Sequence, residues 1–76
     1  MIAEHDVVVL TRELPELGLK QGDVGAVVHR YTAGEGYEVE FVTAEGKTIA
    51  VVTLTADDVR PFAGKEILHA RTVPSV

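Results

Sequence analysis

Short runs of β-branched residues, each followed by glycine or polar turn residues, are the feature that most limits how this chain can fold. The runs occupy residues 5–10, 23–31, 37–41 and 47–54, with turns predicted at 32–36 and 43–46. Runs of this length and composition are typical of strands joined by hairpins. The stretch YEVEF alternates most regularly, and its two glutamates predict one solvated face and one buried face.

The segment ELPELGLKQG between the first two runs is predicted to be a loop. Pro15, Gly18 and Gly22 prevent a helix of useful length there. Its leucines, Leu14, Leu17 and Leu19, indicate a loop that folds over one end of the core instead of extending into water. Gly25, inside the second strand, predicts a bulge or a close approach of another stretch of backbone.

The end of the chain differs from the hairpin region. Thr55, Asp57 and Asp58 predict a single 3₁₀ turn that Pro61 ends, and Val59 begins a short fifth strand. We therefore expect an all-β fold, a small SH3-like barrel of about five strands with a 3₁₀ turn before the last strand. The barrel is expected to occupy residues 1–62. Residues 63–76 are expected to form a C-terminal extension, either a packing arm or a flexible tail.

Size and charge narrow the classes of protein to which the chain can belong. Its 76 residues form one domain, and no cysteine is present for a disulfide or a thiolate metal site. The formal charge is −5 and the seven basic residues lie singly, which disfavours binding to nucleic acid. The first ten residues contain no basic region and only a short apolar run, so we expect neither a leader nor a membrane span and predict a cytoplasmic protein.

Several segments together resemble a family of short bacterial proteins catalogued as a domain of unknown function. They are DVVVLTRELPELGLKQGDVGAVVHRY, YEVEF, TIAVVTL and DDVRP. The family pattern looks like D-x-V-x-L-x-x-D-L-P-E-x-G-L-x-x-G-D-x-G-T-V-V, then Y-x-V-E-F and T-L-x-x-x-D-x-R-P. The likeness runs from about Asp6 to Pro61, with Glu13 in place of the usual aspartate, and does not cover the tail.

The resemblance implies a fold and brings no established activity with it. More distantly, the layout is similar to the barrel domain of the nitrile hydratase β subunit, to the small stromal subunit of photosystem I and to KOW-containing domains. These likenesses imply two alternatives to a plain interaction module. One is an accessory module that docks on a metalloenzyme such as a nitrile hydratase-like complex. The other is a KOW-like nucleic-acid module, which the negative charge disfavours.

Catalytic, cofactor and metal sites are not predicted. Ser75 is the only serine and lies in the tail, and the three histidines have no spacing typical of a catalytic set. The stretch EHD contains three ligand types, but adjacent strand residues point to opposite faces. The GEG stretch lies between two strands, where a phosphate loop would need a following helix. We therefore expect a non-enzymatic protein without cofactors.

Failure of alternation in three strands is the strongest sequence signal for an interaction surface. In VVVL, AVVH and IAVVTL both faces carry apolar groups, so one set should face outward. The set predicted to fill the interior is Val7, Val9, Val24, Val39, Phe41, Ile49 and Val51. The set predicted to face outward is Val8, Ala50, Val52 and part of 26–28. Either the tail covers this outer set through Ile67 and Leu68, or a second subunit does.

A second candidate surface lies in the loop, at Glu13, Leu14, Pro15, Glu16 and Leu17. Acids beside apolar residues suit a basic peptide or a protein partner. The alternative is that the leucines only cap the barrel and the acids are solvated. The sequence therefore predicts a non-catalytic protein-interaction module, which forms a homodimer or small homo-oligomer or binds an unidentified bacterial protein, without nucleic acid or membrane.

Overall fold

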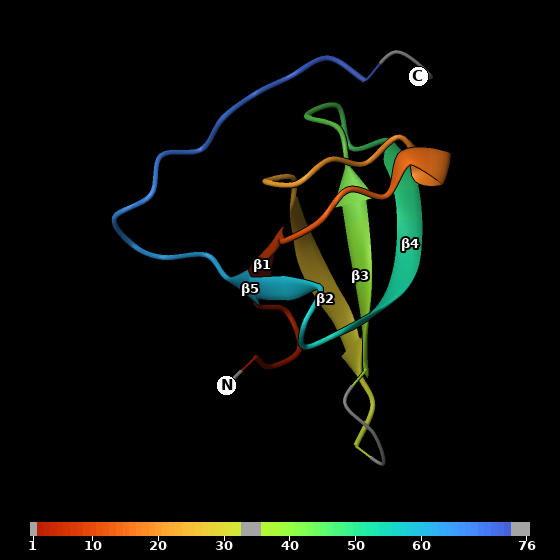
Figure 1. Cartoon of the computed structure of the whole chain (residues 1–76), viewed down its shortest axis with the longest axis vertical. Helices are drawn as coiled ribbons and strands as arrows, with labels where there is room; N and C mark the ends of the chain where they lie inside the picture. The colour runs from red at the N-terminus through yellow and green to blue at the C-terminus, as the bar shows by residue number, and fades with distance from the viewer. Residues whose placement is uncertain (1, 33–35, 74–76) are drawn as a thin grey trace.

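The computed structural model describes residues 2–32 and 36–73 and shows one curved, open sheet of five antiparallel strands (Figure 1). The elements in chain order are β1 (Val7–Leu10), η1 (Pro15–Leu17), β2 (Val24–Arg30), β3 (Gly36–Val42), β4 (Thr48–Thr55) and β5 (Val59–Pro61). The strand order is β4-β3-β2-β1-β5, so the last strand returns beside the first. The predicted class, a small all-β barrel-like domain of about five strands, is confirmed.

The position of the 3₁₀ helix differs from the prediction. A single turn does precede β5, closed by the Asp58 amide, which donates to the Thr55 carbonyl (3.0 Å). The 3₁₀ helix lies instead at η1, in the segment predicted to be an irregular loop. Gly18 ends η1 in a left-handed conformation (φ 72°), which a residue with a Cβ adopts only with strain. The β2–β3 turn residues 33–35 and Ser75 lie outside the described residues.

The core lies on the concave face of the sheet and is closed at one end by the loop between β1 and β2. Leu14 and Leu19 are buried in it, and each amide donates to the other's carbonyl (2.9 and 3.1 Å). The loop is thereby pinned over the barrel end, which confirms the predicted lid for two of the three leucines. Leu17 remains 39% exposed.

The predicted facing of β3 is correct, whereas that of β1 is wrong. Val39 and Phe41 are buried in the core as expected. Val8, predicted to face outward, is fully buried in the core, and Val7, predicted to be interior, is 45% exposed. A run of valines carries no polar residue to mark its solvated face, so its pattern fixes no direction.

The facing of β4 is likewise reversed. Ala50 and Val52 pair with Phe41 and Val39 and pack against the core, although both were predicted to face outward. Val51 was predicted to be interior but pairs with Glu40 and is 52% exposed. Ile49 has no partner in the β3–β4 register because the pairing shifts there, and it still packs against the core as expected.

Two further residues assigned to the interior, Val9 and Val24, face each other across β1 and β2 on the side opposite Val8. Val9 is buried and Val24 half-buried, yet neither belongs to the core cluster. Gly25 is opposite Val8 on the core side. An added Cβ there would lie 2.7 Å from Val39 Cγ1 and 3.0 Å from the Glu40 carbonyl oxygen, so the predicted close backbone approach at Gly25 is confirmed.

Candidate interaction surface

The structure does not bring together the residues of the first predicted interaction surface, which are Val8, Ala50, Val52, Ile67 and Leu68. Val8 is in the core and Ala50 and Val52 pack against it, so these three side chains form no outer surface. Ile67 and Leu68 are 91% and 67% exposed, so they do not cover an apolar patch on the sheet. The physical reason is the reversed facing of β1 and β4, which removes the surface that these two residues were expected to cover.

The predicted loop surface is partly exposed. Pro15, Glu16 and Leu17 are exposed in η1, whereas Leu14 is buried. The Glu13 carboxylate is exposed but accepts a hydrogen bond from the Gln21 amide (2.8 Å), which bridges the two sides of the loop. Glu13 thus has a local structural contact, and Leu14 is the one residue of this predicted surface that is buried.

The segment 63–73, which we call the arm, is held close to β5 by its first anchor. Arg60 Nη1 and Nη2 donate to the two carboxylate oxygens of Glu66 (2.7 and 2.5 Å). The same carboxylate accepts the Ala63 amide (2.7 Å), which closes a turn at the start of the arm. The Arg60 guanidinium, followed by this amide, lowers the pKa of Glu66 from 4.5 to about 2.

The second anchor joins the arm to the start of β2. Arg71 Nε and Nη2 donate to the two carboxylate oxygens of Asp23 (2.9 and 2.5 Å), and Nη2 also donates to the Gly18 carbonyl (2.9 Å). Burial alone would raise the pKa of Asp23, but hydrogen bonds from Arg71 and the Lys20 amide lower it below its usual value. The bidentate pair therefore fixes the far end of the arm across the loop.

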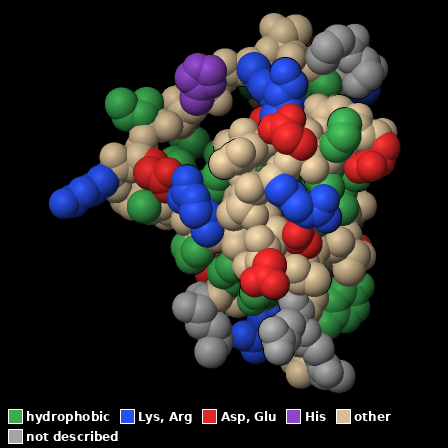
Figure 2. Space-filling view, viewed as in Figure 1, with side chains coloured by type: hydrophobic (Ala, Val, Ile, Leu, Met, Phe, Trp, Pro, Cys, Tyr) green, Lys and Arg blue, Asp and Glu red, His purple; other side chains and the backbone are tan. Residues whose placement is uncertain are grey.

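Between these anchors the arm bows away from the sheet and returns over the end where β2 begins and the β3–β4 turn lies (Figure 1). Figure 2 shows the resulting opening between the arm and the body, with hydrophobic side chains along it and basic side chains next to acidic ones on this face. The arm is thus tied at two points and free of the sheet between them.

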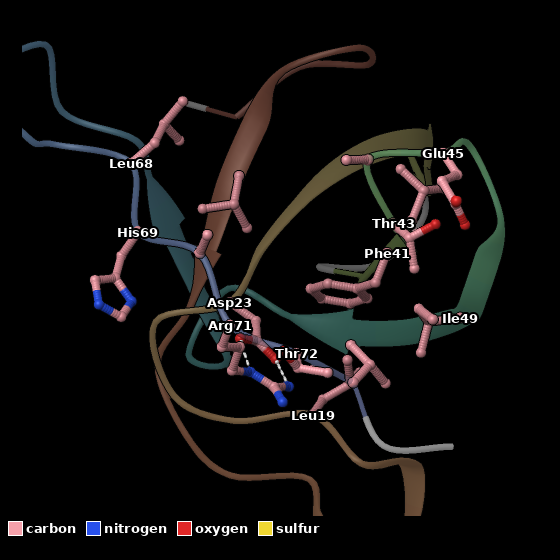
Figure 3. A pocket seen from close by; sticks show the side chains of 15 residues that line it. Leu19, Asp23, Phe41, Thr43, Glu45, Ile49, Leu68, His69, Arg71 and Thr72 are labelled. Carbon is pink, nitrogen blue, oxygen red and sulfur yellow. Dashed lines mark hydrogen bonds and ion pairs between the residues drawn. The ribbon is translucent and has the colours of Figure 1, made fainter. Parts of the chain in front are cut away.

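A hollow of about 630 Å³ lies under the returning part of the arm (Figure 3). Its apolar walls come from the loop, the sheet and the arm, namely Leu19, Val24, Phe41, Val42, Ile49 and Leu68. His69 and Glu45 also line it, as does the Asp23–Arg71 pair. A hollow with apolar walls and a few polar groups at the edge suits an apolar side chain of a partner.

Ionisable groups meet at a separate place on the convex face. His29 Nδ1 lies 3.4 Å from the Glu4 carboxylate, and its ring stands edge-on to Tyr31 at 4.7 Å. Partial desolvation, followed by the charge of Glu38, raises the pKa of Tyr31. Within residues 2–32 and 36–73, no three potential metal ligands come together.

The aspartates Asp6, in the EHD stretch, and Asp58, before β5, both have structural partners. Asp6 accepts the Ala3 amide (2.9 Å), which closes the turn before β1. Asp58 accepts the Thr55 amide (2.9 Å) and Arg12 Nε (2.7 Å). The Thr55 amide and then Arg12 lower the pKa of Asp58. These contacts stabilise turns and tie the β1 end to the β4–β5 turn.

Sequence reasoning missed the second anchor of the arm. Asp23 and Arg71 are 48 residues apart, and neither lies in a pattern that marks a pairing. The sequence analysis expected the tail to pack through the apolar side chains of Ile67 and Leu68. The structure instead holds the arm through two ion pairs. In the described part of the chain, no helix is long and apolar enough to cross a membrane.

Comparisons with known proteins identify the family of the chain. No curated protein and no solved structure matches it. One family model, described as "Domain of unknown function (DUF4926)", matches residues 4–61. The match includes all five strands and ends with β5, so it stops before the arm. The sequence resemblance to a domain of unknown function is thereby confirmed, and the chain belongs to the DUF4926 family.

Proposed function

We propose that this protein is a non-catalytic protein-interaction module that binds an apolar segment of a partner in the hollow beneath its arm. The observation that carries the proposal is the hollow itself, about 630 Å³ in volume and walled by apolar side chains from three parts of the chain. The volume is sufficient for one or two large side chains of a protein partner. A cytoplasmic location remains a prediction of the sequence.

The arm supports this function because it presents its apolar side chains beside the hollow. Ile67 and Leu68 lie between the two anchors, and neither is covered by the described residues. Leu68 lines the hollow and Ile67 precedes it in the chain, so a partner that enters the hollow would bury Leu68, and burial of a side chain of this size contributes about 1.5–3 kcal/mol. The anchors also restrict the arm before binding, which lowers the entropic cost of ordering it.

The test uses a library of random peptides displayed on phage, selected against the immobilised full chain. Enriched peptides should contain large apolar residues. They should bind the double variant Ile67→Ser/Leu68→Ser at least tenfold more weakly than the unchanged chain. Both side chains are exposed, so stability should change by less than about 0.5 kcal/mol for each substitution.

Leu17→Ser is the matched control, because Leu17 is an exposed leucine on the competing loop surface. It should leave peptide binding unchanged. Binding that is lost in Leu17→Ser and kept in the double variant would move the site to η1 and contradict the proposal. Failure to enrich any peptide would contradict it as well.

A further inference from the structure

β4 forms an open edge of the sheet. It lies at one end of the strand order and, among the described strands, pairs only with β3 (Figure 1). Its sequence, TIAVVTLT, contains no charged residue, glycine or proline, and all but Ala50 and Leu54 are β-branched. A long, uncharged edge of this composition presents backbone N–H and C=O groups that can pair with another strand.

The opposite edge, β5, has the features that prevent such pairing. It is only three residues long, contains Arg60 and Pro61, and leads directly into the arm. Short length, charge and proline are the usual protections of an exposed edge. The contrast identifies β4 as the edge that remains available.

The available part of β4 is centred on Val52. The register shift leaves Ile49 without a partner on β3, so the regular strand begins at Ala50. At the other end, the Thr55 amide donates to the Asp58 carboxylate (2.9 Å) and the Thr55 carbonyl accepts the Asp58 amide (3.0 Å). Both backbone groups of Thr55 are thus occupied. The uninterrupted stretch is 50–54, and its middle residue is Val52.

We infer that a second copy of this chain pairs with β4 in antiparallel fashion, about a two-fold axis at Val52, and joins the two five-stranded sheets into one. The inference goes beyond the proposed function and adds a second kind of partner, the chain itself. A two-fold axis keeps the concave faces of both copies on the same side. The arm hollow of each copy is a separate surface.

The side chains of β4 favour a second copy as the partner, because two β4 strands can pair antiparallel with each other without a clash of charge. Pairing about Val52 sets Val51 beside Thr53 of the second copy, and Ala50 beside Leu54. None of these residues is charged, so no like charges face each other across the axis. Thr–Val and aliphatic neighbours of this kind stabilise antiparallel pairs.

The ends of β4 add charge complementarity. Lys47 immediately precedes the strand and Asp57 follows it by two residues. Antiparallel pairing brings the Lys47 end of one copy to the Asp57 end of the other. Within residues 2–32 and 36–73, neither side chain takes part in an ion pair of its own chain. Both are therefore available to contact their opposites.

The dimer is expected to be weak and strengthened by salt. Pairing through five residues buries less than about 1,200 Å², the range of transient contacts. Each copy carries a net charge of −5, so long-range repulsion opposes association until salt screens it. A dimer held by Lys47 and Asp57 alone would weaken with salt, whereas strand pairing is insensitive to screening.

The experiment measures association of the full chain by sedimentation equilibrium up to about 1 mM, with amide NMR spectra at the same concentrations. A monomer–dimer equilibrium should appear, and the amide signals of 50–54 should shift with concentration. Val51→Lys should weaken the dimer at least tenfold, as a charged edge does in other sheets. Val51 is 52% exposed and lies opposite Glu40, so the variant keeps its fold.

Val7→Lys is the matched control. Val7 is 45% exposed on the convex face, in the same cross-strand row as Val51 but three strands away. It should leave the dissociation constant unchanged within about twofold. A chain that stays monomeric to 1 mM would overturn the inference.

An equal loss of dimer affinity in Val7→Lys, with amide signals that shift at Val7 and Val28, would also overturn it and indicate face-to-face packing. Peptide binding at the arm hollow should be the same in Val51→Lys, so failure of either proposal is visible separately.

Discussion

Gly25 is the residue at which the curvature of the sheet depends on the absence of a side chain. It lies opposite Val8 on the concave face, where two core side chains of β3, Val39 and Phe41, approach the backbone of β2. A Cβ at this position would lie 2.7 Å from Val39 Cγ1, 2.9 Å from Phe41 Cε1 and 3.0 Å from the Glu40 carbonyl oxygen. The glycine therefore allows the largest core residue of β3 to approach the backbone of β2.

Substitution Gly25→Ala should consequently destabilise the domain. The extra methyl group forces two buried side chains to shift, and overpacking of this kind costs about 1–3 kcal/mol. Urea unfolding followed by circular dichroism measures the loss. Gly64→Ala is the control, because nothing lies within 4 Å of a Cβ at Gly64. Equal stability of Gly25→Ala and the unchanged chain would show that β3 yields without cost.

At the scale of elements, the β4–β5 turn connects the two ends of the sheet through one carboxylate. Asp58 accepts the Thr55 amide (2.9 Å), the Thr55 hydroxyl (3.1 Å) and Arg12 Nε (2.7 Å). The Thr11 amide donates to the Asp58 carbonyl (2.8 Å), so the turn is also bonded to the residue that follows β1. The side chain of Asp58 thus determines where β5 meets β1.

Asp58→Asn should lower the free energy of unfolding by about 1–2 kcal/mol at pH 7, because the amide keeps an acceptor but loses the charge. The pKa of Asp58 is lowered in the folded protein, so its stabilising effect is present above the ordinary value of 3.8 and is lost as the pH falls below it. The difference between the two proteins should therefore shrink from pH 5 to pH 3. Asp57→Asn, an exposed neighbour, should show no such difference.

The elements also show what the sequence could and could not predict. In β3, Glu38 and Glu40 mark the solvated face, so the burial of Val39 and Phe41 followed from the pattern. In β1 every position is apolar, as are residues 49–52 of β4, and a shift of one residue changes which side chains are buried. The sequence could predict that these strands exist. It could not predict which side chains are buried, because this depends on the pairing of β4 with β3 and of Val8 in β1 with Gly25 in β2.

For the whole molecule, the arm was the least predictable part, because it is held by charge pairs, one of which joins residues 48 positions apart in the sequence. Glu66 pairs with Arg60 at one end and Arg71 with Asp23 at the other. The family match covers 4–61 and omits the arm, so the sheet and its lid form the common unit. The hollow that carries the proposed function exists only where this arm returns to the sheet.

Acid should release the arm while the sheet remains folded. The pKa of Glu66 is lowered from 4.5 to about 2 and that of Asp23 is also lowered, so both anchors are complete at neutral pH. Because both pKa values are lowered, the two carboxylates stabilise the anchored arm above the ordinary carboxyl pKa, and this stabilisation is lost as the pH falls towards 2. Amide exchange at 63–73 should therefore rise between about pH 4.5 and 2, relative to the exchange of unstructured peptides.

Arg71→Met should produce the same release at pH 7, because it keeps the aliphatic stem and removes the donors to Asp23. A partly exposed pair of this kind contributes modestly, so exchange of the arm amides should rise about two- to fivefold. Lys65→Met removes a charge that no described ion pair uses and should change nothing. Release should also weaken peptides selected for the hollow, since one wall is then displaced. If Arg71→Met instead leaves amide exchange in the arm unchanged, the ion pair with Asp23 does not hold the arm. Its apolar contacts would then hold it.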